Sequence, residues 1–147
     1  MRIVPWLLVL RVQVVYDEQT MAMAHPFVLE ELQSLLSPDR LRVKAMFGSH
    51  ALYVDEKIVF ILRHKATPDD GVWVALSDAG HARSLVSEFP TLRGIEMFAQ
   101  RAFGDWVLLP EDGEGFEESA MGLCGLLGKR DARLGKVPKG RKKRAAR

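Results

Sequence analysis

Cysteine is almost absent from this chain, and long apolar runs are absent altogether. Cys124 is the single cysteine among 147 residues, so the chain can form neither an intrachain disulfide nor a cysteine-rich zinc site. The most apolar stretch, 5–15, is interrupted by Arg11 and Gln13 and is shorter than the roughly 20 apolar residues that a membrane-spanning helix needs. We therefore expect a cytoplasmic protein without a membrane partner.

Sequence signatures of catalysis and of cofactor binding are also missing. The chain has no P-loop and no dinucleotide-binding fingerprint. Its histidines do not show the HxH or HxxxH spacing that is typical of metal ligands on one strand or helix. We therefore expect no enzyme, no catalytic or metal-binding residue and no cofactor. The histidines stand at positions 25, 50, 64 and 81.

Three pairs of neighbouring carboxylates are candidates for acid–base chemistry. A catalytic carboxylate needs burial or a close like charge to shift its pKa. These pairs fall in predicted loops or at the start of a predicted helix, where acids are solvated or interact favourably with the helix dipole. We expect them to be solvated or capping groups rather than catalytic ones. The pairs are Asp69–Asp70, Glu111–Asp112 and Glu117–Glu118.

Three further side chains could carry chemistry in the right surroundings. His50 and Tyr53 lie three positions apart in a predicted strand, so they should point to opposite faces of the sheet and cannot jointly form one site. Cys124 lies on the apolar face of a predicted helix, where a free cysteine usually behaves as a small hydrophobic residue. One alternative stays open: a pocket near residues 47–53 that binds a small molecule or carries out a reaction.

Apolar residues recur with helical or strand periodicity along most of the chain. Val28, Leu32 and Leu35 repeat at helical spacing before Pro38 ends the pattern. The run at 58–62 is β-branched and aromatic, which suits a central strand covered on both faces. The predicted elements are helices at 26–36, 77–89 and 116–128 and strands at 43–47, 50–54, 58–62, 72–76, 94–98 and 106–110.

The order of these elements, α-β-β-β-β-α-β-β-α, predicts an α+β fold. Strands joined by short turns favour a mainly antiparallel sheet, here of about five to six strands with three helices. Residues 26–130 form the predicted domain. Residues 1–25 are an extension with three interpretations: a segment upstream of a true start at Met21 or Met23, an extra strand, or a secretion signal.

Charge is distributed unevenly along the chain. Residues 129–147 carry ten Lys and Arg and one acid, a net charge of +9, whereas residues 1–128 carry a net charge of −7. Segment 131–147 has low complexity and no aromatic residue, so we expect a disordered basic tail that binds phosphates weakly and in a salt-dependent way. The candidate nucleic-acid contacts are Lys136, Lys139, Arg141, Lys142, Lys143 and Arg144.

The stretch MFGSHALYVDEKIVFIL, Met46–Leu62, resembles the start of the TfoX N-terminal-domain family. In that family a Met-Phe-Gly turn leads into a Leu-Tyr-Val-Asp hairpin and an apolar strand. The later GIEMF and GDWVLLPEDGEGFEESAMGLCGLL fit the family's short strand, aromatic strand ending in proline, and closing helix. The likeness covers residues 27–130. Asp55-Glu56 and Gly48-Ser49 replace the commoner Asp-Gly and Gly-Gly turns.

The resemblance implies a compact α+β domain with no catalytic motif to carry over. The family's name-giving members are competence regulators, in which a second helical domain follows. Only the basic segment follows Gly128 here, so the chain is similar to the stand-alone members. We expect a non-catalytic regulatory or binding module, monomeric or homodimeric, with a protein partner in the transcription machinery. The alternative is a nonspecific nucleic-acid binder that acts through the tail.

Overall fold

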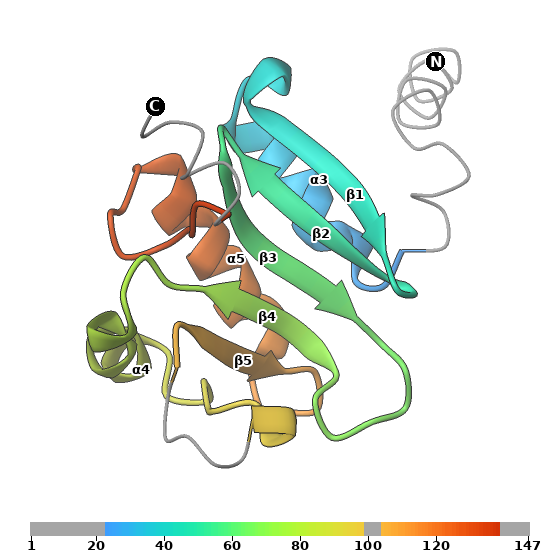
Figure 1. Cartoon of the computed structure of the whole chain (residues 1–147), viewed down its shortest axis with the longest axis vertical. Coiled ribbons are helices and arrows are strands. Elements are labelled where there is room, and N and C mark those ends of the chain that lie inside the picture. Colours follow the sequence, from blue (N-terminus) through green and yellow to red (C-terminus); the bar gives the residue numbers. More distant parts are fainter. Residues whose placement is uncertain (1–22, 99–103, 139–147) are drawn as a thin grey trace, which may run out of the picture.

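The computed structural model describes residues 23–98 and 104–138. Its strands form one antiparallel sheet in the order β1-β2-β3-β4-β5, so each strand pairs with its neighbours along the chain (Figure 1). This architecture confirms the predicted α+β fold. The strands are β1 (Leu41–Met46), β2 (Ser49–Val54), β3 (Lys57–Arg63), β4 (Gly71–Ala75) and β5 (Trp106–Pro110), and the helices are α3 (Pro26–Leu35), α4 (Ala82–Glu88) and α5 (Phe116–Gly128).

Local sequence accounts for the first hairpin. Phe47 has a φ of 48° and Gly48 a φ of 80°, which is the left-handed conformation that a tight two-residue turn between antiparallel strands requires. Gly48 adopts this conformation without a steric cost, whereas Phe47 adopts it at a cost because of its Cβ atom. The Phe47 side chain is 91% exposed, so it is held by the turn and not by packing.

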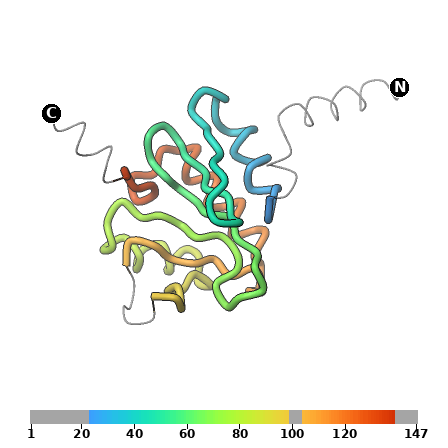
Figure 2. The backbone as a smooth tube through the Cα atoms, turned by 45° about the vertical axis from the view of Figure 1, so that its right-hand side comes forward, coloured from blue at the N-terminus to red at the C-terminus, as the bar shows by residue number. Residues whose placement is uncertain are grey.

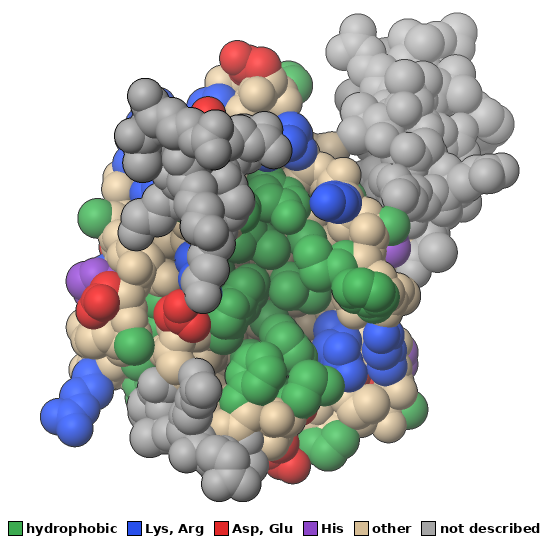
Figure 3. Space-filling view, in the orientation of Figure 1, with side chains coloured by type: hydrophobic (Ala, Val, Ile, Leu, Met, Phe, Trp, Pro, Cys, Tyr) green, Lys and Arg blue, Asp and Glu red, His purple; other side chains and the backbone are tan. Residues whose placement is uncertain are grey.

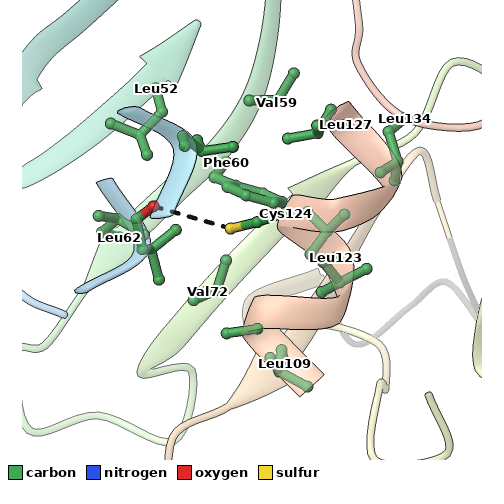
Figure 4. Close-up of a cluster of buried hydrophobic side chains, with 14 of the residues drawn as sticks. Leu52, Val59, Phe60, Leu62, Val72, Leu109, Leu123, Cys124, Leu127 and Leu134 are labelled. Carbon is green, nitrogen blue, oxygen red and sulfur yellow. Dashed lines mark hydrogen bonds between the residues drawn. The ribbon is translucent and has the colours of Figure 1, made fainter. Parts of the chain in front are cut away.

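Helices α3 and α5 lie side by side on one face of the sheet, and no helix of the described residues covers the other face (Figure 1, Figure 2). The main core fills the space between these two helices and the sheet, and it contains Phe60, Leu62 and Leu123 (Figure 4). The pairing of β2 with β3 shifts between Leu52 and Tyr53, and Val59 and Phe60 both belong to this core as a result. The core therefore holds the sheet against α3 and α5, with its other face turned away from these helices.

The predicted strand at 94–98 is wrong. Within the described residues this segment contains a single 3₁₀ turn, η3 (Glu96–Phe98), preceded by an isolated bridge between Arg93 and Leu108. The Asp69 carboxylate explains the difference, because it accepts hydrogen bonds from the N–H groups of Glu96 at 2.7 Å and Met97 at 3.0 Å. These donors are thereby satisfied without a partner strand.

The predicted helix at 77–89 also begins later than its apolar pattern suggested. Asp78 is the capping residue, and its carboxylate accepts from the Gly80 N–H at 2.9 Å. A 3₁₀ turn, η2 (Ala79–His81), then leads into α4. No helix among the described residues is both long and apolar enough to cross a membrane.

The predicted disorder of the tail begins too early in the chain. Leu134 is only 2% exposed. The Gly135 N–H donates to the Ala75 carbonyl at 2.9 Å, and Lys136 exchanges two backbone hydrogen bonds with Ile58. Residues 131–138 therefore belong to the domain. Residues 139–147 and residues 1–22 of the predicted extension 1–25 lie outside the described residues. Met23, from the end of that extension, is buried in the main core.

Candidate functional site

The face of the sheet without a helix, here called the open face, is apolar at its centre (Figure 3). Side chains alternate between the two faces of a strand, so each residue of the main core has neighbours that point the other way. These neighbours form two small clusters in which Trp73 and Leu108 are buried and Tyr53, Ile61 and Trp106 are partly buried. The other members are Met46, Ala51, Ile58, Ala75 and Ile95.

One end of the open face is covered by the segment that contains η3. The Phe98 ring stands edge-on to Trp73 at a centroid distance of 5.8 Å, and Trp106 meets Trp73 at 6.3 Å. Met97 and Phe98 themselves are 58% and 42% exposed. The apolar surface therefore extends from β2 across the sheet to η3.

The charged side chains of the five strands are all basic. None of the strands contains an acidic residue, although residues 1–128 are acidic in total. The Arg42 guanidinium lies over the Tyr53 ring at 5.1 Å, and the Arg63 guanidinium lies over the Trp73 ring at 5.3 Å. Both contacts have cation–π geometry. Lys44 is exposed on the same side of β1 as Arg42, so cations border the apolar centre.

A second candidate, here called the polar pocket, lies at the edge of the sheet. Gly71 pairs with Arg63 on one side and with Pro110 on the other, and these residues form the last row of β3, β4 and β5. The next residues outward on each strand are His64, Asp70 and Glu111, and the Glu111 N–H still donates to the Asp70 carbonyl at 3.1 Å. The antiparallel register thus brings these three side chains together. His64 and Glu111 line a pocket with His25 and Pro26 at the start of α3.

Glu111 is the centre of the polar pocket. Its carboxylate lies 2.8 Å and 3.0 Å from His64 Nδ1 and 2.9 Å from His25 Nε2. His64 Nδ1 is also 3.8 Å from Asp70 Oδ2. The hydrogen bond to Glu111, followed by the negative charge of Glu111, raises the pKa of His64 above its ordinary value. The pocket can therefore hold a proton or a cation between its imidazoles and carboxylates.

Asp70 is fixed by the loop between β3 and β4. Its carboxylate accepts from the Lys65 N–H at 2.9 Å, from the Thr67 N–H at 3.0 Å and from the Thr67 hydroxyl at 3.0 Å. Burial alone would raise the pKa of Asp70, but these hydrogen bonds outweigh it and lower the pKa. Asp69 and Asp70 were expected to be solvated or capping groups. They are not solvated, because they are only 4% and 6% exposed, but Asp69 does cap the first N–H groups of η3.

The polar pocket opens into a cavity of about 630 Å³. Of the residues 47–53, near which the sequence left a pocket open, Gly48 lines this cavity and the others do not. His50 is 6% exposed and pairs with the core residue Leu62, whereas Tyr53 belongs to the open face, so their predicted separation is confirmed. The cavity is lined by Met23, Ala24, His25, Pro26, Phe27, Gly48, His64, Glu111, Phe116 and Glu117.

Sequence patterns gave no sign of the polar pocket. His64 and Glu111 are 47 positions apart, and no spacing rule for metal ligands or catalytic pairs covers such a distance. The usable signal would have been the hairpin register, because each of these residues lies within two positions of the end of a predicted strand. That inference requires the strand order, which the sequence left open.

The other predicted features have clear positions. Cys124 is fully buried, its thiol is 3.8 Å from the Val28 carbonyl, and burial raises its pKa to about 12, so its predicted role in the core is confirmed (Figure 4). Glu117 and Glu118 occupy the first turn of α5, as predicted. Lys136 forms an ion pair with Asp105. The other predicted nucleic-acid contacts, Lys139, Arg141, Lys142, Lys143 and Arg144, lie outside the described residues.

Comparison with known proteins does not extend this description. No family model, no curated protein and no solved structure matches the chain. The resemblance to the TfoX N-terminal domain therefore stays a prediction from the sequence, and the geometry of the open face and of the polar pocket carries the functional argument.

Proposed function

We propose that the chain is a non-catalytic regulatory module whose open face binds an acidic, amphipathic segment of a protein partner. The observation that carries this proposal is the combination of an apolar sheet face, which no helix in the described part of the chain covers, with strands whose charged residues are all basic. A partner that offers apolar side chains beside Asp and Glu complements both properties.

The residue types on the open face support a protein partner. Aromatic residues and arginine are enriched at protein–protein interfaces and supply most of the residues that dominate binding energy. Tyr53 and Trp106 are partly exposed, and the guanidinium of Arg42 already stacks on Tyr53. A base of a nucleic acid would have to displace that stacked guanidinium, whereas a carboxylate could pair with Arg42 in place.

The predicted resemblance to TfoX N-terminal domains gives the proposal its biological direction. If the resemblance holds, the partner belongs to the transcription machinery and the module acts in transcription regulation or competence. The α+β fold agrees with that family's expected architecture. The open face, which binds the partner, is then the functional site of the module.

Charge reversal on β1 tests the proposal. The probe is a fluorescein-labelled amphipathic peptide that alternates Leu and Phe with Asp and Glu, and its lysine-for-acid counterpart is the probe control. We expect saturable binding of the acidic peptide, with a change in Trp106 fluorescence. In Arg42→Glu/Lys44→Glu the Kd should rise by about tenfold or more.

A matched variant separates this effect from the change in net charge. Arg83→Glu/Lys129→Glu reverses two exposed cations of the helices, away from the open face, and should bind like the unchanged protein. Equal loss in both variants, or no binding of the acidic peptide, would contradict the proposal. Tighter binding of oligothymidylate at the same tryptophan would assign the face to single-stranded nucleic acid. A concentration-dependent dimer that is detected by light scattering and is lost in the charge-reversed variant would assign the open face to a second copy of the chain.

Nucleic-acid binding through the tail is a second candidate, favoured by the net charge of +9 in residues 129–147. The informative variant ends after Pro138, because residues 134–138 are part of the domain. Fluorescence anisotropy with duplex DNA at several salt concentrations should show weaker binding and a shallower salt slope in that variant. Unchanged affinity and salt slope would rule out the tail as the binding segment.

A further inference from the structure

We propose that His64, Asp70 and Glu111, with His25 as a fourth donor, bind a divalent transition-metal ion of the zinc type. The proposal is independent of the open face. It assigns a ligand to the polar pocket, which the proposed binding function does not use.

The donor atoms are already gathered in a space that a metal ion can fill. One ligand atom each of His64, Asp70 and Glu111 lies within 4.8 Å of the other two. Donors that surround zinc tetrahedrally at about 2.0–2.1 Å are separated by roughly 3.3 Å, so His64 and Glu111 need to move apart by only about half an ångström. His64 is 62% exposed and is free to make that adjustment.

His25 is the fourth candidate ligand, and it contacts the other three through Glu111. Its Nε2 atom lies 2.9 Å from Glu111 Oε1, the same oxygen that lies 3.0 Å from His64 Nδ1. The two imidazole rings are 6.4 Å apart and nearly perpendicular. His25 precedes α3 and His64 follows β3, so an ion held by both would connect the helical layer to the sheet edge.

The chemistry of the donors selects the type of ion. Two imidazole nitrogens with two carboxylates suit zinc and similar transition metals, whereas calcium and magnesium prefer a shell made of oxygen ligands. Glu117 adds a third carboxylate to the cavity wall. Arg63 is an opposing charge, with Nε 3.9 Å from Asp70 Oδ1 and with its guanidinium over the Trp73 ring at 5.3 Å on the open face. The carboxylates outnumber it, so the local charge favours a cation.

The surrounding hydrogen bonds orient Asp70 before any ion binds. Both of its oxygens accept from the loop 65–67, while Oδ2 still faces His64 Nδ1 at 3.8 Å. Second partners of this kind fix ligand geometry in metal sites, and their loss typically lowers metal affinity by about 10–100-fold. The side chain is therefore a preorganised ligand rather than a free surface acid.

Metal titration of the full chain tests the inference. The protein is treated with EDTA and dialysed, and ZnCl₂ is then added in a calorimeter. We expect one zinc ion per chain and a rise in Tm that EDTA reverses. CoCl₂ should give the visible absorption bands of a four-coordinate cobalt ion. In His64→Gln/Glu111→Gln the zinc Kd should rise by about tenfold or more.

His81→Gln is the matched control, because it removes a histidine far from the polar pocket and should bind zinc like the unchanged protein. Circular dichroism of both metal-free variants checks that they fold, and His25→Gln provides a second, milder variant should the double variant unfold. Absence of zinc binding by the unchanged protein would overturn the inference. Equal affinity in the pocket variants and in His81→Gln would also overturn it.

Discussion

Glu111 determines the behaviour of the polar pocket, because a single carboxylate contacts two histidines from different elements. His25 belongs to the start of α3 and His64 to the end of β3. The contact raises the pKa of His64, first through the hydrogen bond and then through the charge of Glu111. The protonated imidazole and the carboxylate thus support each other in the absence of a metal ion.

The His64 titration should follow from this pairing. The pKa of His64 in the folded state lies above its ordinary value of 6.5, so the folded state binds the proton more tightly than the unfolded chain does. The pairing therefore stabilises the fold fully below about pH 6.5, and that contribution disappears as the pH rises through the raised pKa. NMR titration of the His64 ring should give a midpoint above 6.5 in the unchanged protein.

Glu111→Gln should move that midpoint down toward 6.5. Asp112→Asn is the control, because Asp112 is the exposed neighbour and makes no hydrogen bond or ion pair with His64 within the described residues. A midpoint that stays in place in Glu111→Gln, or that moves equally in Asp112→Asn, would contradict the assignment of the shift to Glu111.

Cys124 should be chemically inert in the folded protein. Its thiol is fully buried, and burial raises its pKa to about 12, so almost no thiolate is present at neutral pH. We expect no reaction with DTNB at pH 8 in native buffer and complete reaction after denaturation in guanidinium chloride. Fast labelling of the native protein would show that α5 opens without global unfolding.

The interior of helix α5 contains two glycines that weaken it and that differ in their surroundings. A Cβ atom on Gly122 would lie 2.7 Å from Cε1 of Phe89, whereas a Cβ atom on Gly125 would have no neighbour within 4 Å. Gly122 therefore permits the close approach of the residue that ends α4. Gly125 has no such packing role within the described structure.

The two glycines should respond oppositely to alanine. Gly125→Ala should raise the free energy of unfolding by up to about 1 kcal/mol, because alanine is the better helix former. In Gly122→Ala the clash with Phe89 should outweigh that gain and lower the free energy of unfolding by about 1 kcal/mol. Urea denaturation of the two variants compares them directly. If both alanine variants were equally stabilised, the Phe89 ring would be able to move away from residue 122 without a cost in free energy.

The domain as a whole depends on a segment that follows its last helix. Leu134 fills the core beside α5, and Gly135 and Lys136 hydrogen-bond to β4 and β3. Arg133 reinforces the segment through ion pairs with Asp131 and Glu88, each at 2.7 Å. The end of α5 is therefore not the end of the folded unit.

Two truncations should locate that boundary. A chain that ends after Pro138 retains all these contacts and should keep its Tm. A chain that ends after Arg133 loses the buried Leu134 side chain and the backbone hydrogen bonds, which should lower the free energy of unfolding by about 2–5 kcal/mol. Thermal unfolding followed by circular dichroism measures both. Equal Tm values would place the boundary before Leu134.

Local patterns in the sequence determined most of the elements of this protein. The apolar runs at 58–62 and 72–76 are strands in the structure, and the helical spacing at 116–128 is a helix. The alternation that separates His50 from Tyr53 and the apolar position of Cys124 are equally local. These inferences succeed because side-chain direction repeats with the period of the element, which neighbouring residues set by themselves.

Only the tertiary structure decided the features that depend on distant partners. Residues 94–98 have a strand-like pattern, yet Asp69, 27 positions from Glu96, caps them into a 3₁₀ turn. The tail was predicted to be disordered because of its composition, yet Leu134 finds a place in the core. The polar pocket exists because the register of three strands aligns His64, Asp70 and Glu111. Periodicity carries no information on register or on long-range capping, so these contacts arise only when the strands pair and the core closes.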